Sequence, residues 1–165
     1  MISYSYIKKN VRNLNSRYTK SKSTQDASYY SKLAILELCG WIEISLDEAI
    51  LSAGNRILKN PKSVKFLENK VKRIYGFDYE DHLTSMIVSL IGISGFERLE
   101  NSIDVSVLLN FKNELAILKD RRNSLAHTYT RGATVHYDAP SITFARLEKV
   151  SAGIKAYDIA LKAIK

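Results

Sequence analysis

Three residues in the C-terminal half of the chain have side chains that could act together on a phosphate group. Arg122, Asn123 and His127 lie in the stretch KDRRNSLAHTYTRG, near the end of a pattern that predicts a helix. A histidine can transfer protons near neutral pH, and an arginine can hold phosphoryl charge through two hydrogen bonds. Asn123 could orient the imidazole or bind the phosphate. These residue types are therefore suited to acid–base chemistry or binding at a phosphate ester.

The predicted helix that carries these residues covers about 105–127. Arg122 falls on its apolar line, where an unpaired guanidinium would be costly to bury. Arg122 and His127 are five residues apart, about 140° around a straight helix, so one unbroken helix surface cannot bring them together. Either the helix unwinds before His127, or a second copy of the chain completes the site. The apolar line is Leu108, Phe111, Leu115, Leu118, Arg122 and Leu125, and a neighbouring polar line is Asn113, Ala116, Asp120, Asn123 and His127.

Each of these residues also has a purely structural interpretation. Arg122 could extend past the core to solvent, or pair with a carboxylate such as Glu43, which lies on the flank of the second helix's apolar stripe. The pattern slightly favours Glu43 as an ordinary glutamate at the edge of the core. His127 could lie in the last helical turn because a cation is favourable beside the free carbonyl groups there. His82, in an acidic turn, and His136, in a loop, suggest no role.

Length and composition favour one helical domain over residues 1–165. The chain is 45% hydrophobic, which is enough for a core, and its two prolines and seven glycines are few for a turn-rich β fold. Cys39 is the only cysteine and suits a reducing compartment. The start MISYSYIKKN lacks the apolar core of a signal peptide, and the apolar run MIVSLIGISGF is too short to span a bilayer. We therefore expect a cytoplasmic protein that does not engage a membrane.

Apolar residues at helical spacing predict an all-α bundle of long antiparallel helices. We expect helices over about 3–20, 27–58, 61–75, 83–91 and 105–127, and a last helix that includes 147–164. Asp26 is the expected cap of the second helix, and Pro61 suits the first turn of the third. The residues GISG should end the fourth helix, and NSIDVS offers caps for the fifth.

The net charge of +8 is distributed in blocks. Residues 1–25 hold six Lys and Arg without an acid, and residues 55–76 hold seven with Glu68 as the only acid. Such blocks favour a polyanionic partner such as RNA, although a basic surface can also serve solubility alone. The expected RNA contacts include Lys8, Lys9, Arg12, Arg121 and Arg131.

The residues around Arg122 resemble the signature of the HEPN superfamily (higher eukaryotes and prokaryotes nucleotide-binding). That signature is an arginine, a polar residue directly after it, and a histidine at R-x4–6-H spacing. Here these are Arg122, Asn123 and His127; Arg121 also fits the spacing, but the asparagine favours Arg122. LKDRRNSLAHTY resembles bacterial HEPN groups of defence and toxin–antitoxin systems, including the RiboL-PSP-like group. The close resemblance covers about a dozen residues, and Thr128 stands where many members have glycine.

The resemblance implies a HEPN-like helical fold and a metal-independent endoribonuclease. In that mechanism the RNA's 2′-OH attacks the adjacent phosphate, which leaves a 2′,3′-cyclic phosphate and a 5′-OH without any cofactor. It also implies a site at a two-fold homodimer interface, and an antitoxin or antiviral defence partner. No Cys/His cluster or paired-carboxylate spacing in the sequence suggests a metal site. The alternative is a non-catalytic HEPN module that binds RNA, nucleotide or a protein; a plain helical dimerisation protein would leave Arg122 unexplained.

Overall fold

The computed structural model of the chain describes residues 3–127 and 137–164, with the backbone alone at residues 126 and 127. Six α-helices and one π-helical turn, η1, make up this part of the chain, which contains no strand. The predicted all-α fold class is therefore confirmed. The elements are α1 (Tyr4–Thr19), α2 (Thr24–Ile57), α3 (Pro61–Lys72), η1 (Tyr79–Thr84), α4 (Ser85–Asn101), α5 (Val105–His127) and α6 (Pro140–Ala163).

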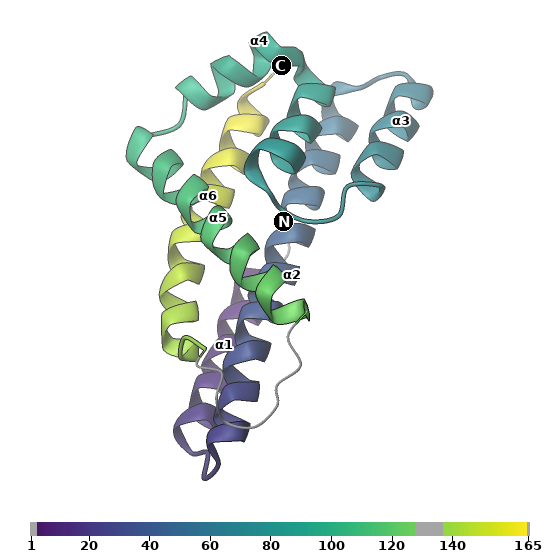
Figure 1. Cartoon of the computed structure of the whole chain (residues 1–165). Helices are drawn as coiled ribbons and strands as arrows, with labels where there is room; N and C mark the ends of the chain where they lie inside the picture. Colours follow the sequence, from purple (N-terminus) through teal and green to yellow (C-terminus); the bar gives the residue numbers. More distant parts are fainter. Residues whose placement is uncertain (1–2, 128–136, 165) are drawn as a thin grey trace.

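The long helix α2 forms the axis of the molecule (Figure 1). Helices α1 and α6 pack against it and against each other, and α5 packs mainly against α6 and α2. Helices α1 and α5 run in the opposite direction to α2 and α6 (Figure 1). The shorter α3 packs on α2 and α4 at the far end of the bundle, so that the segment after α3 returns toward the middle of α2.

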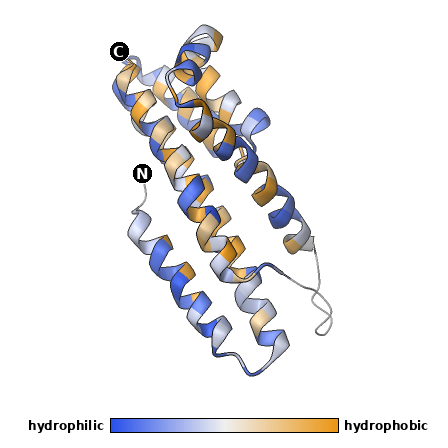
Figure 2. Ribbon diagram, turned by 90° about the vertical axis from the view of Figure 1, so that its left-hand side faces the viewer, coloured by the Kyte–Doolittle hydropathy of each residue, from blue (hydrophilic) through white to orange (hydrophobic). Residues whose placement is uncertain are grey.

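One hydrophobic core is shared by the helices. In α1 the buried positions form a single line of three residues, and most of that helix is hydrophilic (Figure 2). The middle of α2 is buried on several sides because α1, α5 and α6 surround it. Trp41 lies in this region with its indole edge-on to Tyr4 of α1, at a centroid distance of 6.3 Å. None of the described helices combines the length and apolar character that a membrane crossing requires.

Side chains at the helix ends explain where the helices begin. The predicted cap of α2 was wrong: Ser23 Oγ accepts from the amides of residues 25 and 26, so Asp26 lies inside the first turn. Asn60 caps α3, with Pro61 in the first turn as predicted. Asp104 accepts from the amides of residues 106 and 107 at the start of α5, within the predicted NSIDVS cap.

Helix α4 is interrupted where the sequence predicts a break, but it does not end there. Gly92 has φ 71° and ψ 170°, a conformation that glycine adopts without strain. A second helical segment follows directly and continues to Asn101, so the predicted break after residue 91 is confirmed, whereas the helix beyond Gly92 was not predicted. The second half has its own buried positions, Gly95 and Leu99, whose packing favours continued helix after the kink.

Helix α6 needs a glycine at residue 153 because α5 approaches it closely there. A Cβ built on Gly153 would lie 2.3 Å from ring atoms of the fully buried Phe111. Gly153→Ala is therefore expected to lower the free energy of unfolding by about 1–3 kcal/mol through overpacking. Gly40→Ala in α2 is the matched control, because its Cβ would meet nothing within 4 Å. It should stabilise the helix by about 0.5–1 kcal/mol. Urea denaturation would contradict the close approach if both variants gained stability.

Candidate functional site

Arg122 does not lie in the core, although its neighbours on the apolar line do. Leu118 and Leu125 are each 1% exposed, whereas the Arg122 side chain is 38% exposed. Its flexible stem allows the guanidinium to reach the surface from a helix position that faces inward. The side chain therefore extends past the core from a core-facing position, which is one of the two interpretations that the sequence left open.

Glu43 of α2 is the described ionic partner of Arg122. Arg122 Nη2 lies 3.7 Å from Glu43 Oε2, and the other carboxylate oxygen, Oε1, accepts a 2.7 Å hydrogen bond from the amide of Gly76. The sequence slightly favoured Glu43 as an ordinary boundary residue, whereas the structure gives it two specific partners. Glu43 therefore joins α2, α5 and the segment between α3 and η1.

Gly76 brings a third side chain, His82, to the same place. The φ of Gly76 is +118°, and a Cβ built there would lie 2.8 Å from His82 Cε1 and 3.8 Å from Arg122 Nη1. A residue with a side chain would be strained by this backbone and would also displace the imidazole. His82 and Arg122 therefore both approach the position that a Cβ of Gly76 would occupy. His82 was not among the residues predicted for the site, and the only local signal for it in the sequence is the turn YGFDYED that precedes it.

The orientation of His82 is fixed by the π-helical turn η1. The amide of Asp78 donates to His82 Nδ1 at 3.0 Å, and the Asp78 carbonyl accepts from the amides of His82 and Leu83. Because Nδ1 acts as an acceptor, the neutral imidazole carries its proton on Nε2. Single π-helical turns of this kind are often found at functional sites.

Lys119 fastens this turn to α5. Its ammonium donates to Asp78 Oδ2 at 2.5 Å, while Asp78 Oδ1 accepts from the amide of Asp81. The hydrogen bond from Lys119 is the main reason why the pKa of Asp78 lies below its ordinary value. Lys119 and Arg122 are three residues apart on one helix face. The same face of α5 therefore holds the turn through Lys119 and lies beside Gly76 through Arg122.

Two further residues of α2 lie one turn to either side of Glu43. Burial raises the pKa of the Cys39 thiol to about 12, against an opposing effect of the Arg122 charge. The thiol faces the carbonyl of Leu118 at 3.8 Å, so Cys39 belongs to the core and is not an activated nucleophile. Burial, and secondly the charge of Glu43, raise the pKa of Asp47 to about 6.

Replacing Asp47 by asparagine is expected to stabilise the chain at neutral pH. The pKa of Asp47 is about 6 in the folded chain against an ordinary 3.8, so the folded state binds the proton more tightly. Stability from this group is fully present below about pH 4 and is lost as pH rises through 6. Asp47→Asn should gain about 1 kcal/mol near pH 7.5, after allowance for solvent screening, and nothing at pH 3.5.

Urea denaturation at the two pH values measures this difference. Glu97→Gln is the control because Glu97 is an exposed glutamate on another helix, α4. An Asp47→Asn gain of equal size at both pH values would contradict a titrating carboxyl as its cause.

The remaining residues of the Arg122 motif lie on the outer side of α5. Asn123 is exposed, and so are Asn113, Ala116 and Asp120 of the same polar line. The backbone stays helical through His127, so the proposed unwinding before that residue was wrong. The side chain of His127 lies outside the described part of the chain, as do all of Arg131 and His136.

The structure does not gather the other predicted RNA contacts at Arg122. Arg121 Nη2 lies 3.4 Å from Asp138 Oδ2. Lys8 lies 3.5 Å from Glu148 and also over the ring of Phe144, and the Arg12 guanidinium lies over the same ring. Lys9 is exposed on α1. Lys8 and Arg12 therefore belong to the interface between α1 and α6.

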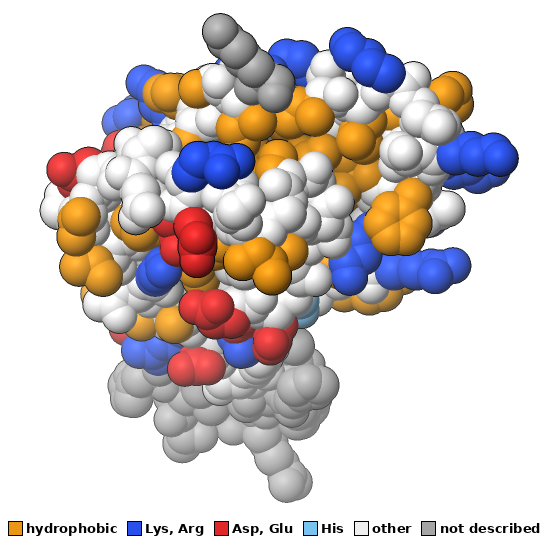
Figure 3. Space-filling model, turned by 90° about the horizontal axis from the view of Figure 1, so that it is seen from above, with side chains coloured by type: hydrophobic (Ala, Val, Ile, Leu, Met, Phe, Trp, Pro, Cys, Tyr) orange, Lys and Arg blue, Asp and Glu red, His pale blue; other side chains and the backbone are white. Residues whose placement is uncertain are grey.

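Helix α3 presents a basic surface that contains two exposed aromatic rings. Phe66 is 65% exposed, and Tyr75, directly before Gly76, is 78% exposed. Lys and Arg side chains project beside hydrophobic groups at the right of Figure 3, on the side where α3 lies in Figure 1. We call this set the α3 surface: Lys62, Lys65, Phe66, Lys72, Arg73 and Tyr75.

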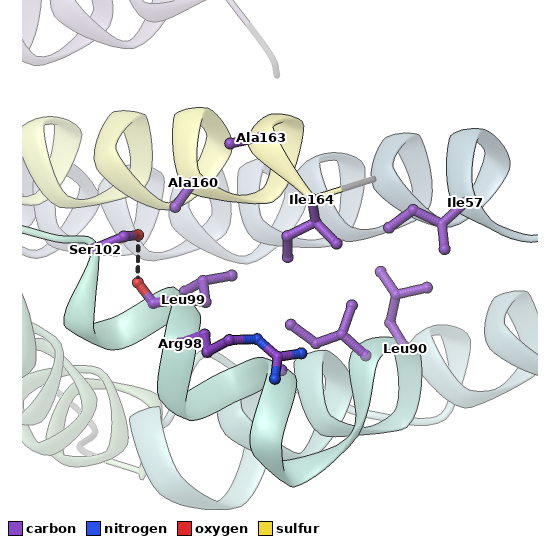
Figure 4. Close-up of a pocket in the computed structure, with 10 residues that line it drawn as sticks. Ile57, Leu90, Arg98, Leu99, Ser102, Ala160, Ala163 and Ile164 are labelled. Atoms are coloured by element: carbon purple, nitrogen blue, oxygen red, sulfur yellow. Dashed lines mark hydrogen bonds between the residues drawn. The ribbon is translucent and has the colours of Figure 1, made fainter.

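A groove of about 500 Å³ lies between α4, the end of α6 and the end of α2 (Figure 4). Ile57, Leu90 and Ile164 point toward one another across it. It is lined by neither histidine nor carboxylate, so it contains no acid–base pair. Its lining residues are Ile57, Leu90, Ile91, Gly95, Arg98, Leu99, Ser102, Ala160, Ala163 and Ile164.

Among the described residues, no group of three or more His, Cys, Asp or Glu side chains is placed to hold a metal ion. Around Gly76 the described structure brings together Arg122, Glu43, His82 and the Lys119–Asp78 pair. Comparison with models of known protein families, with curated proteins and with solved structures finds no match for this chain.

Proposed function

We propose that this protein is a metal-independent endoribonuclease of HEPN type. One observation carries the proposal: Arg122, the arginine of the R-N-x3-H motif, is partly exposed and forms an ion pair with Glu43 instead of being buried. An arginine fixed by a carboxylate is pre-oriented for a phosphate, because its planar donors have less freedom to lose on binding. The exposed Lys and Arg side chains of the α3 surface would attract a polyanionic substrate.

In the proposed reaction the 2′-oxygen of RNA forms a bond to the adjacent phosphorus, and the bond from phosphorus to the 5′-oxygen breaks. The 2′-OH proton leaves to a base, and the 5′-oxygen receives a proton. His127 is proposed to carry out this proton transfer. Arg122 stabilises the extra negative charge of the pentavalent transition state, and Asn123 orients the imidazole or the phosphate. The products are a 2′,3′-cyclic phosphate and a 5′-OH.

We further propose that the nuclease acts as a homodimer. Arg122 and His127 diverge by about 140° on a helix that stays regular between them. The polar line of α5 that leads to the motif is exposed in the single chain. A two-fold contact between these faces would bring Arg122 of one copy toward His127 of the other. A cytoplasmic toxin–antitoxin or phage-defence system is the proposed setting.

A non-catalytic module is the second candidate, and the ion pair itself favours it. Glu43 neutralises part of the charge of Arg122, which weakens its effect on a transition state. The same arrangement would still allow RNA or nucleotide to bind. The intact Arg122–Asn123–His127 set favours the enzyme.

The test is incubation of the purified protein with end-labelled RNA in EDTA, beside His127→Ala. We expect cleavage that survives the chelator, with cyclic phosphate ends identified by mass spectrometry, and little or no cleavage by the variant. Activity that vanishes in EDTA and returns with magnesium would contradict the mechanism. RNA binding without cleavage by the wild type would favour the non-catalytic module.

A further inference from the structure

We propose that His82 and Arg122 bind one phosphate group between them, with His82 donating from Nε2 and Arg122 from Nη1. This deepens the proposed function, which supplies RNA as the source of the phosphate. The motif contains Arg122 but not His82, which lies forty residues earlier in another element. The phosphate position would thus be defined within one chain.

The backbone at Gly76 lies close to both His82 and Arg122. The imidazole and the guanidinium approach the same side of this residue, where a Cβ would touch His82 Cε1 and come within 3.8 Å of Arg122 Nη1. Because residue 76 is glycine, the imidazole can occupy that volume. Two side chains with hydrogen-bond donors, from different elements, therefore meet at one point beside the backbone.

The two terminal nitrogens of the Arg122 guanidinium face different groups. Nη2 lies on the side of Glu43, at 3.7 Å from the carboxylate, whereas Nη1 is the nitrogen nearest to the Gly76 position. A guanidinium has five N–H donors in a plane, so a single long contact to Glu43 does not use them all. The Nη1 edge remains able to donate to an oxyanion while Glu43 holds the other edge.

The hydrogen bond to Nδ1 determines which nitrogen of the neutral His82 ring carries the proton. Its Nδ1 accepts from the amide of Asp78, which leaves Nε2–H as the donor of the neutral ring. A phosphate diester has two non-bridging oxygens, and two separate donors can each take one. A neutral donor beside a cationic donor also avoids placing two like charges around Gly76.

The turn that carries His82 is held by contacts with several helices. Leu83 is buried, and the Tyr79 hydroxyl is hydrogen-bonded to Glu100 of α4 and Tyr157 of α6. Lys119 holds Asp78, and Glu43 holds the amide of Gly76. These contacts fix η1 relative to α5 before any ligand binds. A phosphate would meet a preformed pair of donors and would not have to order a loop.

The test uses the full chain and two probes, inorganic phosphate and a non-cleavable 2′-O-methyl oligonucleotide. NMR at constant pH follows the imidazole signals, which His127→Ala and His136→Ala assign. We expect both probes to shift the His82 signal in the wild type. His82→Ala and Arg122→Ala should each weaken binding about tenfold to a hundredfold. His82→Gln, whose amide can donate from near the Nε2 position, should bind more tightly than His82→Ala.

A His82 signal that neither probe shifts in the wild type would overturn the proposal, and this measurement needs no variant to fold. Phosphate affinity equal to wild type in a folded His82→Ala chain would do the same. Response to phosphate but not to the oligonucleotide would indicate a free phosphate site and would overturn RNA as the source. If both probes bind through His82 but the wild type cleaves no RNA, the nuclease proposal fails and the phosphate site stands. If cleavage depends on Arg122 but not on His82, this inference alone fails.

Discussion

Replacement of Arg122 by alanine is expected to reduce RNA cleavage at least about a hundredfold while the chain stays folded. The proposed role of Arg122 is to stabilise charge that develops in the transition state, and loss of one such donor lowers kcat by about 10²–10³. The side chain is partly exposed, and Glu43 keeps its hydrogen bond from Gly76 when the arginine is removed. We therefore expect a small change in thermal stability beside a large change in rate.

Arg121→Ala is the matched control, because it removes the same charge from the adjacent position. Arg121 is paired with Asp138 and is not on the Glu43 side of the helix. It should retain most of the activity. Arg122→Lys should recover little, because an ammonium lacks the planar fork. Equal losses in Arg121→Ala and Arg122→Ala would show that the charge of the region matters and not the motif.

Mixing Arg122→Ala with His127→Ala chains tests whether the site is shared between copies. A mixed dimer would contain one complete Arg122–His127 pair if each site draws on both chains. Random exchange should then restore roughly a quarter of wild-type activity, because half of the dimers are mixed and each has one site. Full activity from a chain that is monomeric at micromolar concentration would contradict the composite site.

Neutralising the α3 surface is expected to have the second largest effect, on RNA affinity. Replacing Lys62, Lys65 and Lys72 by glutamine should lower the slope of log Kd against log salt by about 2, since each phosphate contact on single-stranded RNA contributes about 0.7. Affinity at low salt should fall more than at high salt. Fluorescence anisotropy with labelled RNA over a salt series measures both.

The α1 triple variant of Lys8, Lys9 and Arg12 removes the same charge and provides the comparison. It should also lower the slope, but by less, because Lys8 is paired with Glu148 and Arg12 lies over Phe144. A larger loss in the α1 variant would place the RNA path across α1 and α6. Tyr75→Ala adds a separate test: loss of a stacked base would weaken binding with little change in the salt slope.

The fold follows from the sequence to a large extent because helix signals are local. Apolar residues at three- and four-residue spacing located α1, α2, α5 and α6, and Pro61 located the start of α3. The boundaries were less accurate where two candidates compete within a few residues. Ser23 caps α2 in place of Asp26, and α4 continues past Gly92 because the residues after the kink pack against the rest of the fold.

Some features of the candidate site could be predicted from the sequence, and others depended on the packing of the helices. The motif residues Arg122, Asn123 and His127 could be named from spacing and residue type alone, because they belong to one helix. The exposure of the Arg122 side chain could not be predicted from the sequence, since a long side chain on an apolar line can either stay inside or extend to the surface. The sequence offered the pairing with Glu43 as one possibility, and the packing of α5 against α2 is what brings the two side chains together.

His82 shows most clearly what only the tertiary structure decided. Its sequence surroundings are an acidic turn, and no periodicity or motif connects it to Arg122. The connection arises because Gly76 adopts a positive φ, Glu43 binds the amide of Gly76, and Lys119 binds Asp78. Local sequence determines which helices form and which side chains they present. Contacts between residues that are distant in the chain determine which of those side chains can meet at one ligand.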